Sequence, residues 1–143
     1  MSQVVLDADS TTLVLNGTVI SDLVAGDIIT ATPVNPLSSH VNSSGGGVTI
    51  NKRTDGDVFD IAFNVQKMSA SDLFMQSQVN QESIVVFNGS MKEDYTRDGS
   101  SGVETWQLGA GSITTQPTDT KNNTDGNATR PYTIRFRNTR RNL

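Results

Sequence analysis

The sequence has no cysteine and only one histidine. Without cysteine, disulfide cross-links, thiolate metal sites and thiol nucleophiles are all excluded. The histidine, His40, lies in a stretch rich in Ser, Asn and Gly, and no G-x-S-x-G sequence accompanies it. A Ser-His-Asp triad therefore has no support beyond residue types, and His40 is interpreted as an incidental loop residue.

Long hydrophobic runs are also missing. No stretch approaches the roughly 18 apolar residues that span a bilayer, and no basic segment followed by an apolar run opens the chain. Only 34% of the residues are hydrophobic, while Ser, Thr, Asn, Asp and Gly are abundant. We therefore expect a soluble protein made in a cytosol, without membrane binding of its own, and built from turns and polar strands rather than helices.

Two short patterns resemble ligand-binding loops but lack parts of them. The sequence from Asp55 to Asp60 lacks the later oxygen ligands and the closing Glu of a calcium loop, so it is interpreted as a hairpin turn. The Gly109-Ala-Gly111 sequence lacks the third Gly and the helix of a phosphate-binding loop, and indicates a strand bend or bulge. We expect no catalytic residue, cofactor or metal ion, and hence no enzyme.

Charge is distributed unevenly along the chain, although the net charge is only -4. Residues 1–51 contain no Lys or Arg, whereas the last 14 residues contain five Arg and no acid. A basic end suits nucleic acid, an acidic surface on another copy, or solvent. The acidic balance of residues 1–129 argues against a broad phosphate-binding face, because each phosphate contact needs a local cation.

The length of 143 residues predicts a single domain, which we expect to be mainly β. Asn16-Gly17 predicts a tight turn between strands 13–15 and 18–20, and residues 27–32 continue as a strand. Residues 36–47 are predicted to be a long loop, because they cannot bury enough apolar surface to order themselves. Residues 48–51 and 59–65 then predict a hairpin around Asp55-Gly56, with alternate residues facing the core (Phe59, Ile61, Phe63 and Val65).

A single helix is predicted at about residues 69–80, where Ser69 and Asp72 have the spacing of a helix start and Leu73, Met75 or Gln76, and Val79 follow at helical intervals. Further strands are predicted at 84–87, 103–108 and 113–116, with Trp106 in the core or an interface. A polar loop, 118–128, precedes a last strand in which Tyr132, Ile134 and Phe136 alternate with polar residues, and a basic tail follows at 138–143. This pattern predicts a β-sandwich or small barrel with one flanking α-helix.

The central segment resembles the tail tube proteins of contractile-tailed bacteriophages. The run VTINKRTDGDVFDIAFNVQKMSASDLFMQSQVN is similar to their strand, Asp-Gly turn, patterned strand and short helix, and GSITTQP with RPYTIRFR resembles their closing strands. The similarity extends from about Gly45 to Arg137. It implies a virion protein, assembled in the host cytoplasm, that forms hexameric rings stacked into a tube for DNA ejection.

The resemblance also implies partners and contact residues. The expected partners are other copies of the chain, a tail sheath protein, and baseplate and tail-terminator proteins, while DNA passes transiently and non-specifically through the lumen. The long loop would contact neighbouring subunits through Ser38, Ser39, His40, Asn42 and Ser44. A conduit should not hold DNA, so polar side chains are predicted to line the lumen, namely Thr49, Asn51, Asp60 and Asn64.

The oppositely charged ends suggest a further contact, in which Arg140 and Arg141 bind acidic residues near Asp7, Asp9 or Asp22 of a neighbouring copy. Two alternatives use the same sequence features. One is a related ring or tube subunit of a contractile injection or secretion system. The other is a carbohydrate-binding β-sandwich, for which only Trp106, Tyr95 and Tyr132 are available as an aromatic platform.

Overall fold

A computed structural model describes residues 3–26, 28–124 and 128–143. Within these residues, one helix accompanies nine strands, and every strand pairing is antiparallel. In chain order, the elements are β1 (Val4–Leu15), β2 (Thr18–Ile20), β3 (Ile29–Pro33), β4 (Ser38–Asn42), β5 (Val48–Lys52), β6 (Phe59–Gln66), α1 (Ala70–Val79), β7 (Phe87–Arg97), β8 (Ser100–Ser112) and β9 (Thr129–Asn142).

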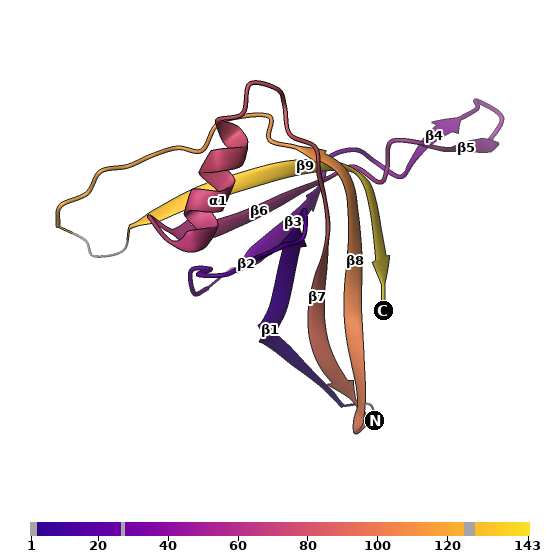
Figure 1. Ribbon diagram of the computed structural model, residues 1–143. Coiled ribbons are helices and arrows are strands. Elements are labelled where there is room, and N and C mark those ends of the chain that lie inside the picture. Colours follow the sequence, from indigo (N-terminus) through magenta and orange to yellow (C-terminus); the bar gives the residue numbers. More distant parts are fainter. Residues whose placement is uncertain (1–2, 27, 125–127) are drawn as a thin grey trace.

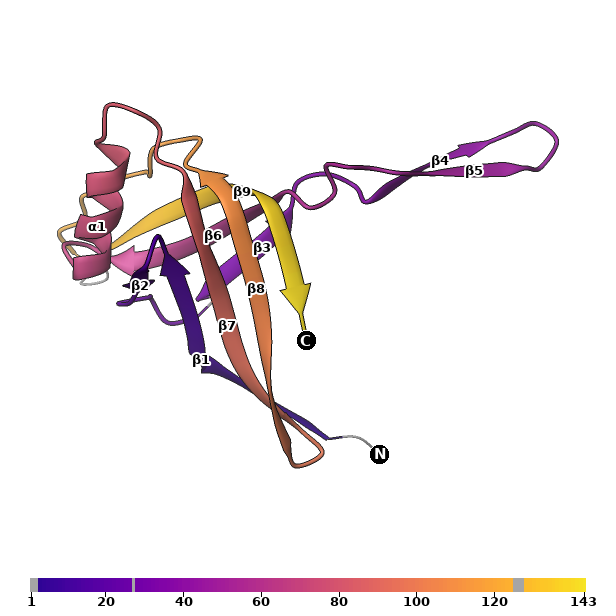
Figure 2. The same ribbon diagram turned by 45° about the vertical axis from the view of Figure 1, so that its right-hand side comes forward.

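Seven strands form one continuous open sheet in the order β2-β1-β7-β8-β9-β6-β3. Strand β9 divides this sheet into two layers, because residues 129–136 pair with β6 and residues 135–142 pair with β8. The strands β3 and β6 therefore belong to a second layer, seen beside α1 in Figure 1 and crossing behind β7 and β8 in Figure 2. The expectation of a β-sandwich with one flanking helix is confirmed, and the open edges at β2 and β3 exclude the alternative of a closed barrel within the described residues.

The core lies between the two layers and follows the alternation of the strands. Ile61, Phe63 and Val65 of β6 are buried, as are Tyr132, Ile134 and Phe136 of β9, so the predicted core faces of both strands are confirmed. The opposite layer contributes residues of β1, β7 and β8, among them Leu13, Leu15, Met91, Trp106 and Leu108. Trp106 is 8% exposed and meets Phe59 edge to face at 5.2 Å, which places it in the core.

The helix covers one end of the sandwich and is attached to both layers. Ser69 is its N-cap, and the Ser69 hydroxyl accepts a hydrogen bond from the Asp72 backbone N–H, as the sequence predicted. Ser71 accepts a hydrogen bond from the backbone N–H of Ser21, which directly follows β2. Met75 is fully buried in the core, whereas Leu73, which the helical spacing also placed on the apolar face, is 59% exposed.

Two of the predicted turn features are confirmed. Asn16 and Gly17 both have positive φ angles and connect β1 to β2, as a tight hairpin turn requires. The register of β7 against β8 shifts between Phe87 and Gly89, opposite Gly109–Gly111, so a bulge lies where the glycines predicted one. A Cβ on Gly89 would lie 1.8 Å from the Val14 carbonyl oxygen, so only glycine allows β1 and β7 to approach this closely.

The structure corrects several predicted elements. Residues 36–47 are not a continuous loop, because β4 lies within them and pairs with β5. Strand β5 therefore does not pair with β6, whose partners are β3 and β9. The predicted strands at 84–87 and 113–116 are absent except for Phe87, while 91–97 forms an unpredicted part of β7. The predicted tail at 138–143 is a strand as far as Asn142, because its backbone pairs with β8.

Candidate assembly surfaces

The most exposed feature of the molecule is the hairpin of β4 and β5, which projects away from the sandwich (Figure 2). Every residue of its two strands is exposed except Ser38, which is half-buried. Its base is closed by a 2.9 Å hydrogen bond from the Arg53 N–H to the Leu37 carbonyl, and its tip by the turn from Ser43 to Gly47. An isolated two-stranded hairpin is marginally stable in water, so this arm lacks the packing that would hold it in one conformation.

The register of the hairpin divides its residues between two faces with different chemistry. Because directly opposed residues share a face, Val48, Ile50 and Lys52 lie on one face with their partners Asn42, His40 and Ser38. The opposite face carries Val41, Thr49, Ser39 and Asn51. We call the face with Val48, Ile50 and Lys52 the apolar–basic face, because it contains two aliphatic side chains and the Lys52 ammonium. The other is almost entirely polar.

The hairpin contains seven of the residues that the sequence predicted to make contacts. Ser38, His40 and Asn42 lie on the apolar–basic face, Ser39 lies on the polar face, and Ser44 lies in the turn. Thr49 and Asn51, predicted to line a lumen, lie on the polar face of the projecting hairpin. They are thus on a different part of the molecule from Asp60 and Asn64, which belong to β6.

Asp60 and Asn64 lie on the outer face of the layer formed by β3, β6 and β9, because they alternate with the buried residues of β6. The neighbouring positions on this outer face are mostly small or uncharged, namely Thr30, Thr32, Ala62, Pro131 and Thr133. Asp60 is paired with Arg135 directly across the ladder, with Nε to Oδ1 at 2.9 Å and Nη2 to Oδ2 at 3.2 Å. The Asp60 carboxylate raises the pKa of Arg135 above its ordinary value. The paired part of this face is therefore polar and electrically balanced.

The proposed charge contacts between the chain ends involve strand residues rather than tails. Arg140 and Arg141 lie in β9, opposite Gln107 and Trp106 of β8, and the Arg141 guanidinium is 5.1 Å from the Trp106 ring centroid. Asp7 lies in β1 directly opposite Asp94, and Asp9 is also in β1. None of Asp7, Asp9, Arg140 and Arg141 forms an ion pair among the described residues. Both charge groups are thus open to contacts with another copy.

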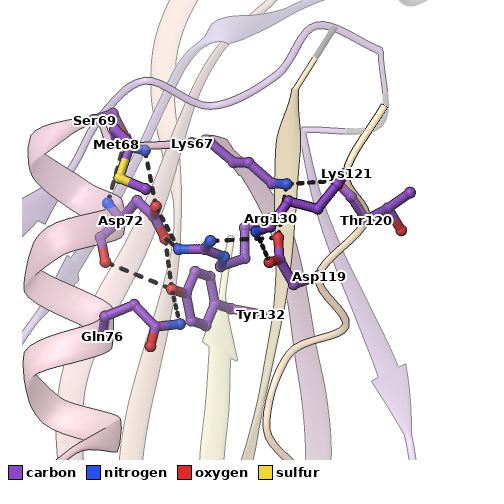
Figure 3. Close-up of polar contacts among 10 residues, drawn as sticks. All are labelled: Lys67, Met68, Ser69, Asp72, Gln76, Asp119, Thr120, Lys121, Arg130 and Tyr132. Atoms are coloured by element: carbon purple, nitrogen blue, oxygen red, sulfur yellow. Dashed lines mark hydrogen bonds and ion pairs between the residues drawn. The ribbon is translucent and has the colours of Figure 1, made fainter. Parts of the chain in front are cut away.

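A buried polar network attaches α1 to the sheet, and apart from Asp72, predicted as part of the helix start, its members were not predicted as a group (Figure 3). The Asp72 carboxylate is 1% exposed and accepts four hydrogen bonds, from Tyr132 Oη at 2.6 Å, from the Met68 N–H at 2.9 Å, and from Arg130 Nη1 at 3.0 and 2.8 Å. Burial alone would raise the pKa of Asp72, but these hydrogen bonds and the Arg130 charge hold it below its ordinary value. The helix therefore docks through a satisfied charge as well as through Met75.

The same arginine continues the network outward to the segment that precedes β9. Asp119 pairs with Lys67 at 2.6 Å, with Lys121 at 2.5 Å and with Arg130 at 3.4 Å. Hydrogen bonds from Lys121 and Lys67 hold the pKa of Asp119 far below its usual range. The described part of the predicted loop, 118–124 and 128, is thus attached to the sheet at Asp119, and residues 125–127 lie outside the described residues.

The described residues offer few candidates for a metal site, a membrane-spanning helix or a sugar-binding platform. The described residues contain no group of three or more His, Cys, Asp or Glu placed to hold a metal ion. No helix in the same part of the chain has the length and apolar character needed to cross a membrane. The aromatic residues considered for sugar binding do not form a platform, since Trp106 and Tyr132 are buried in the core.

The chain was compared with protein families, curated sequences and solved structures. No protein-family model matches the chain, and no curated protein sequence matches it. Among solved structures, the chain is similar to one from "Cryo-EM structure of the anti-feeding prophage (AFP) baseplate, 6-fold symmetrised", with a TM-score of 0.53 and 16% identity. The match covers 92% of this chain and 90% of that chain, so the two folds correspond over nearly their whole lengths. At this level of identity, the similarity establishes the fold.

Proposed function

We propose that this chain is a structural subunit of a phage-like contractile particle, in which six copies form a ring and rings stack into a tube. The observation that carries the proposal is the nearly full-length similarity of fold to a chain of a baseplate with six-fold symmetry. The resemblance of residues 45–137 to tail tube proteins is in agreement with this class of assembly. The role is structural rather than catalytic, and the particle is assembled in the host cytoplasm.

The projecting hairpin supports this role, because a monomer gains nothing from it. Its strands bury almost no surface within the chain, and their backbone order has to be maintained by contacts elsewhere. In an assembly, the hairpin reaches a neighbouring subunit, and both of its faces can become buried. The expectation that residues 36–47 mediate contacts between subunits is thereby retained, with a strand in place of a loop.

The outer face of β3, β6 and β9 suits the wall of a DNA conduit. Where β6 and β9 pair, its one carboxylate and one guanidinium neutralise each other, and Arg137 is the one further cation that follows on this face of β9. A wall of this kind attracts phosphates weakly, since affinity for DNA rises with every unpaired cation that meets a phosphate. We propose that Asp60 and Asn64 line the lumen through this face, and that Thr49 and Asn51 line it through the polar face of the hairpin.

A subunit of a baseplate ring is the second candidate, and it is favoured because the similar solved structure is that of a baseplate. A ring of tube subunits binds a further ring on each of its two faces, so the tube can grow without limit. A baseplate ring binds the tube on one face only, so the stack ends there. The partners then differ as well, since a tube subunit meets a sheath and a baseplate ring meets the first ring of the tube.

Negative-stain electron microscopy of the purified protein, with light scattering on the same sample, tests the proposal. Hollow six-fold rings stacked into tubes of varying length support the tube subunit, and single rings of uniform mass support the baseplate subunit. If the protein remains monomeric at high concentration and also after addition of a tail-initiator or baseplate fraction, the proposal is wrong.

A further inference from the structure

An apolar groove with an acidic rim opens between the two layers of the sandwich, beside the edge strand β3. It has a volume of about 330 Å³, at the low end of the range for sites that enclose organic groups. Ile29 and Ala31 of β3 line one wall, and Met91 and Trp106 line the floor. Because β3 is the last strand of the sheet, the groove lies at an open edge rather than in the sealed core.

Two glutamates at the rim form an unfavourable arrangement within the monomer. Glu93 and Glu104 line the groove and lie directly opposite each other on β7 and β8, where like charges destabilise a sheet. Glu104 accepts a hydrogen bond from Trp106 Nε1 at 2.9 Å, and Glu93 accepts one from Thr11 Oγ1 at 3.5 Å. Neither forms an ion pair among the described residues.

Further acidic residues lie near the groove, and one arginine lies beside its floor, since the Arg141 guanidinium is 5.1 Å from the Trp106 ring centroid. Ala8 lines the groove between Asp7 and Asp9 in the sequence, and Asp94 lies opposite Asp7. Lys92 is the one basic residue that lines the groove among the described residues, and its side chain lies on the opposite face of β7 from Met91 and Glu93. A cation supplied by another molecule would therefore relieve the repulsion between the two glutamates.

The apolar–basic face of the hairpin is complementary to this groove in chemistry and in spacing. Val48, Ile50 and Lys52 alternate along β5, so two aliphatic side chains are followed at the next position on the same face by an ammonium group. On the groove floor, the apolar pair Met91 and Trp106 is followed at the next position on the same face by Glu93 and Glu104. Residues 28–54, which include the whole hairpin, contain no acidic residue.

We propose that the apolar–basic face of the β4–β5 hairpin seats in this groove on the next copy of the chain, with Val48 and Ile50 against Met91 and Trp106 and with Lys52 between Glu93 and Glu104. This inference rests on the proposed function, because it assigns the two surfaces through which subunits join. The hairpin projects away from its own sandwich, so the groove that it fills belongs to another copy (Figure 2). The polar face of the hairpin, with Thr49 and Asn51, then points away from the groove.

Cysteine cross-linking tests this contact, because the natural chain contains no cysteine. Chains carrying Ile50→Cys are mixed with chains carrying Ala31→Cys, assembled, and treated with a short bis-maleimide. A cross-linked dimer on a denaturing gel is expected from this mixture but not from either variant alone. Thr49→Cys is the matched control, since it lies one residue away on the opposite face. An equal yield from Thr49→Cys, or no dimer from Ile50→Cys, overturns the proposal.

Charge reversal provides a second, independent readout. Lys52→Glu and Glu93→Lys should each raise the critical concentration for assembly about threefold or more, as expected for a charge pair at the rim of an interface. The double variant should restore much of the loss, because its copies again present opposite charges. Additive losses in the double variant would contradict the proposed pairing.

The two proposals fail in distinguishable ways. Rings or tubes that form normally but give no cross-link through Ile50 leave the proposed function intact and remove the docking surface. A protein that never assembles, with or without an initiator fraction, removes the proposed function, and the docking surface is rejected with it.

Discussion

At the scale of single residues, Asp72 is the group on which the attachment of α1 depends most. Its carboxylate is buried together with Arg130, whose side chain is 11% exposed, and Tyr132 and the Met68 N–H complete its hydrogen bonding. A buried ion pair stabilises little compared with an apolar pair, but removal of one partner leaves the other charge uncompensated. The network therefore makes the position of α1 specific.

Replacement of Asp72 by Asn should destabilise the protein by about 3–5 kcal/mol, because Arg130 then keeps a buried charge without its counter-ion. Asp119→Asn is the matched control, since Asp119 pairs with the same arginine at an exposed position, and it should have little effect. Urea denaturation followed by circular dichroism measures both. Equal losses for the two variants would show that burial of the Asp72–Arg130 pair is unimportant.

The acid dependence of stability follows from the lowered pKa of Asp72. A carboxyl group whose pKa is lower in the folded state stabilises the fold above its unfolded pKa of about 3.9 and loses that contribution as the pH falls toward its folded pKa. The wild-type protein should therefore lose stability below about pH 4 more steeply than Asp72→Asn.

The raised pKa of Tyr132 predicts a change in stability at alkaline pH. Burial, and then its hydrogen bond to the Asp72 carboxylate, raises the pKa of Tyr132 to about 12. A raised pKa in the folded state contributes stability that is complete below the unfolded value of about 10 and is lost as the pH rises through the folded value. Tyr132→Phe should cost about 1–3 kcal/mol near neutral pH, because Asp72 and Gln76 lose a partner. Its stability relative to wild type should then recover between pH 10 and 12, as measured by thermal melts across that range.

At the scale of elements, the bulge between β7 and β8 depends on a glycine that no other residue can replace. Gly89→Ala should destabilise the fold by about 3 kcal/mol or more, at the upper end of the range for overpacking, because its Cβ would meet the backbone of β1 and not a side chain that can move. Gly109→Ala is the control in the same bulge, since the nearest atom to its Cβ is at an ordinary 3.5 Å. Comparison of the melting temperatures separates steric exclusion from a general effect of substitution in the bulge.

The hairpin should be dispensable for folding. Replacement of Ser38–Lys52 by a short Gly-Ser linker removes strands that contribute nothing to the core. The melting temperature should change by no more than a few degrees, while ring or tube formation should be lost. If the shortened protein assembled as well as wild type under the electron microscope, the hairpin would not be the contact between subunits.

The strands that the sequence predicted well are those with one buried face. In β6, and in residues 131–137 of β9, large apolar residues alternate with small or polar ones, because one side of each strand packs into the core. Residues 91–97 of β7 are polar or charged at nearly every position, and the two strands that flank them determine their extended structure. β4 was missed because it is exposed on both faces, so it has no apolar alternation to detect.

The candidate contacts could not be predicted, because the residues that form them are far apart in the sequence. Asp72 was recognised as part of a helix start, but its partners Arg130 and Tyr132 are 58 and 60 residues away. The opposition of Glu93 and Glu104 depends on the register of the bulged β7–β8 pair. The sequence identified the polar face of β6 from its period, yet only the register with β9 shows that Arg135 neutralises Asp60.

At the scale of the whole molecule, the two layers present different chemistry to their surroundings. On the outer face of β3, β6 and β9, Asp60 and Arg135 neutralise each other, and Arg137 is the next cation along β9. On β1 and β7, Asp7 lies opposite Asp94, and neither carboxylate forms an ion pair among the described residues. In a ring, every copy repeats its faces around the axis, so a single uncompensated charge on the inner wall is multiplied by the number of subunits. In the proposed tube, the wall that faces DNA would therefore be the surface on which charge balance matters most.

The lumen assignment predicts a gain of DNA binding when this balance is broken. Asp60→Asn leaves Arg135 without its counter-ion on the outer face of β6 and β9, and it adds one unpaired cation per subunit at the proposed wall. Assembled tubes of the variant should retain short duplex DNA at low salt and release it as salt increases, because each phosphate contact releases condensed counter-ions. Wild-type tubes should retain less, since each Arg135 is already neutralised and only Arg137, which both proteins share, remains without an ion pair on this face of β9 among the described residues.

Asp94→Asn provides the control for net charge, because it removes one carboxylate from a surface that is not assigned to the wall. Sedimentation of tubes with labelled DNA over a salt series measures all three proteins. Salt-dependent retention by Asp60→Asn alone supports the outer face of β3, β6 and β9 as the lumen. Equal retention by both variants would mean that overall charge controls binding, and the wall would then have to be sought on another face of the sandwich.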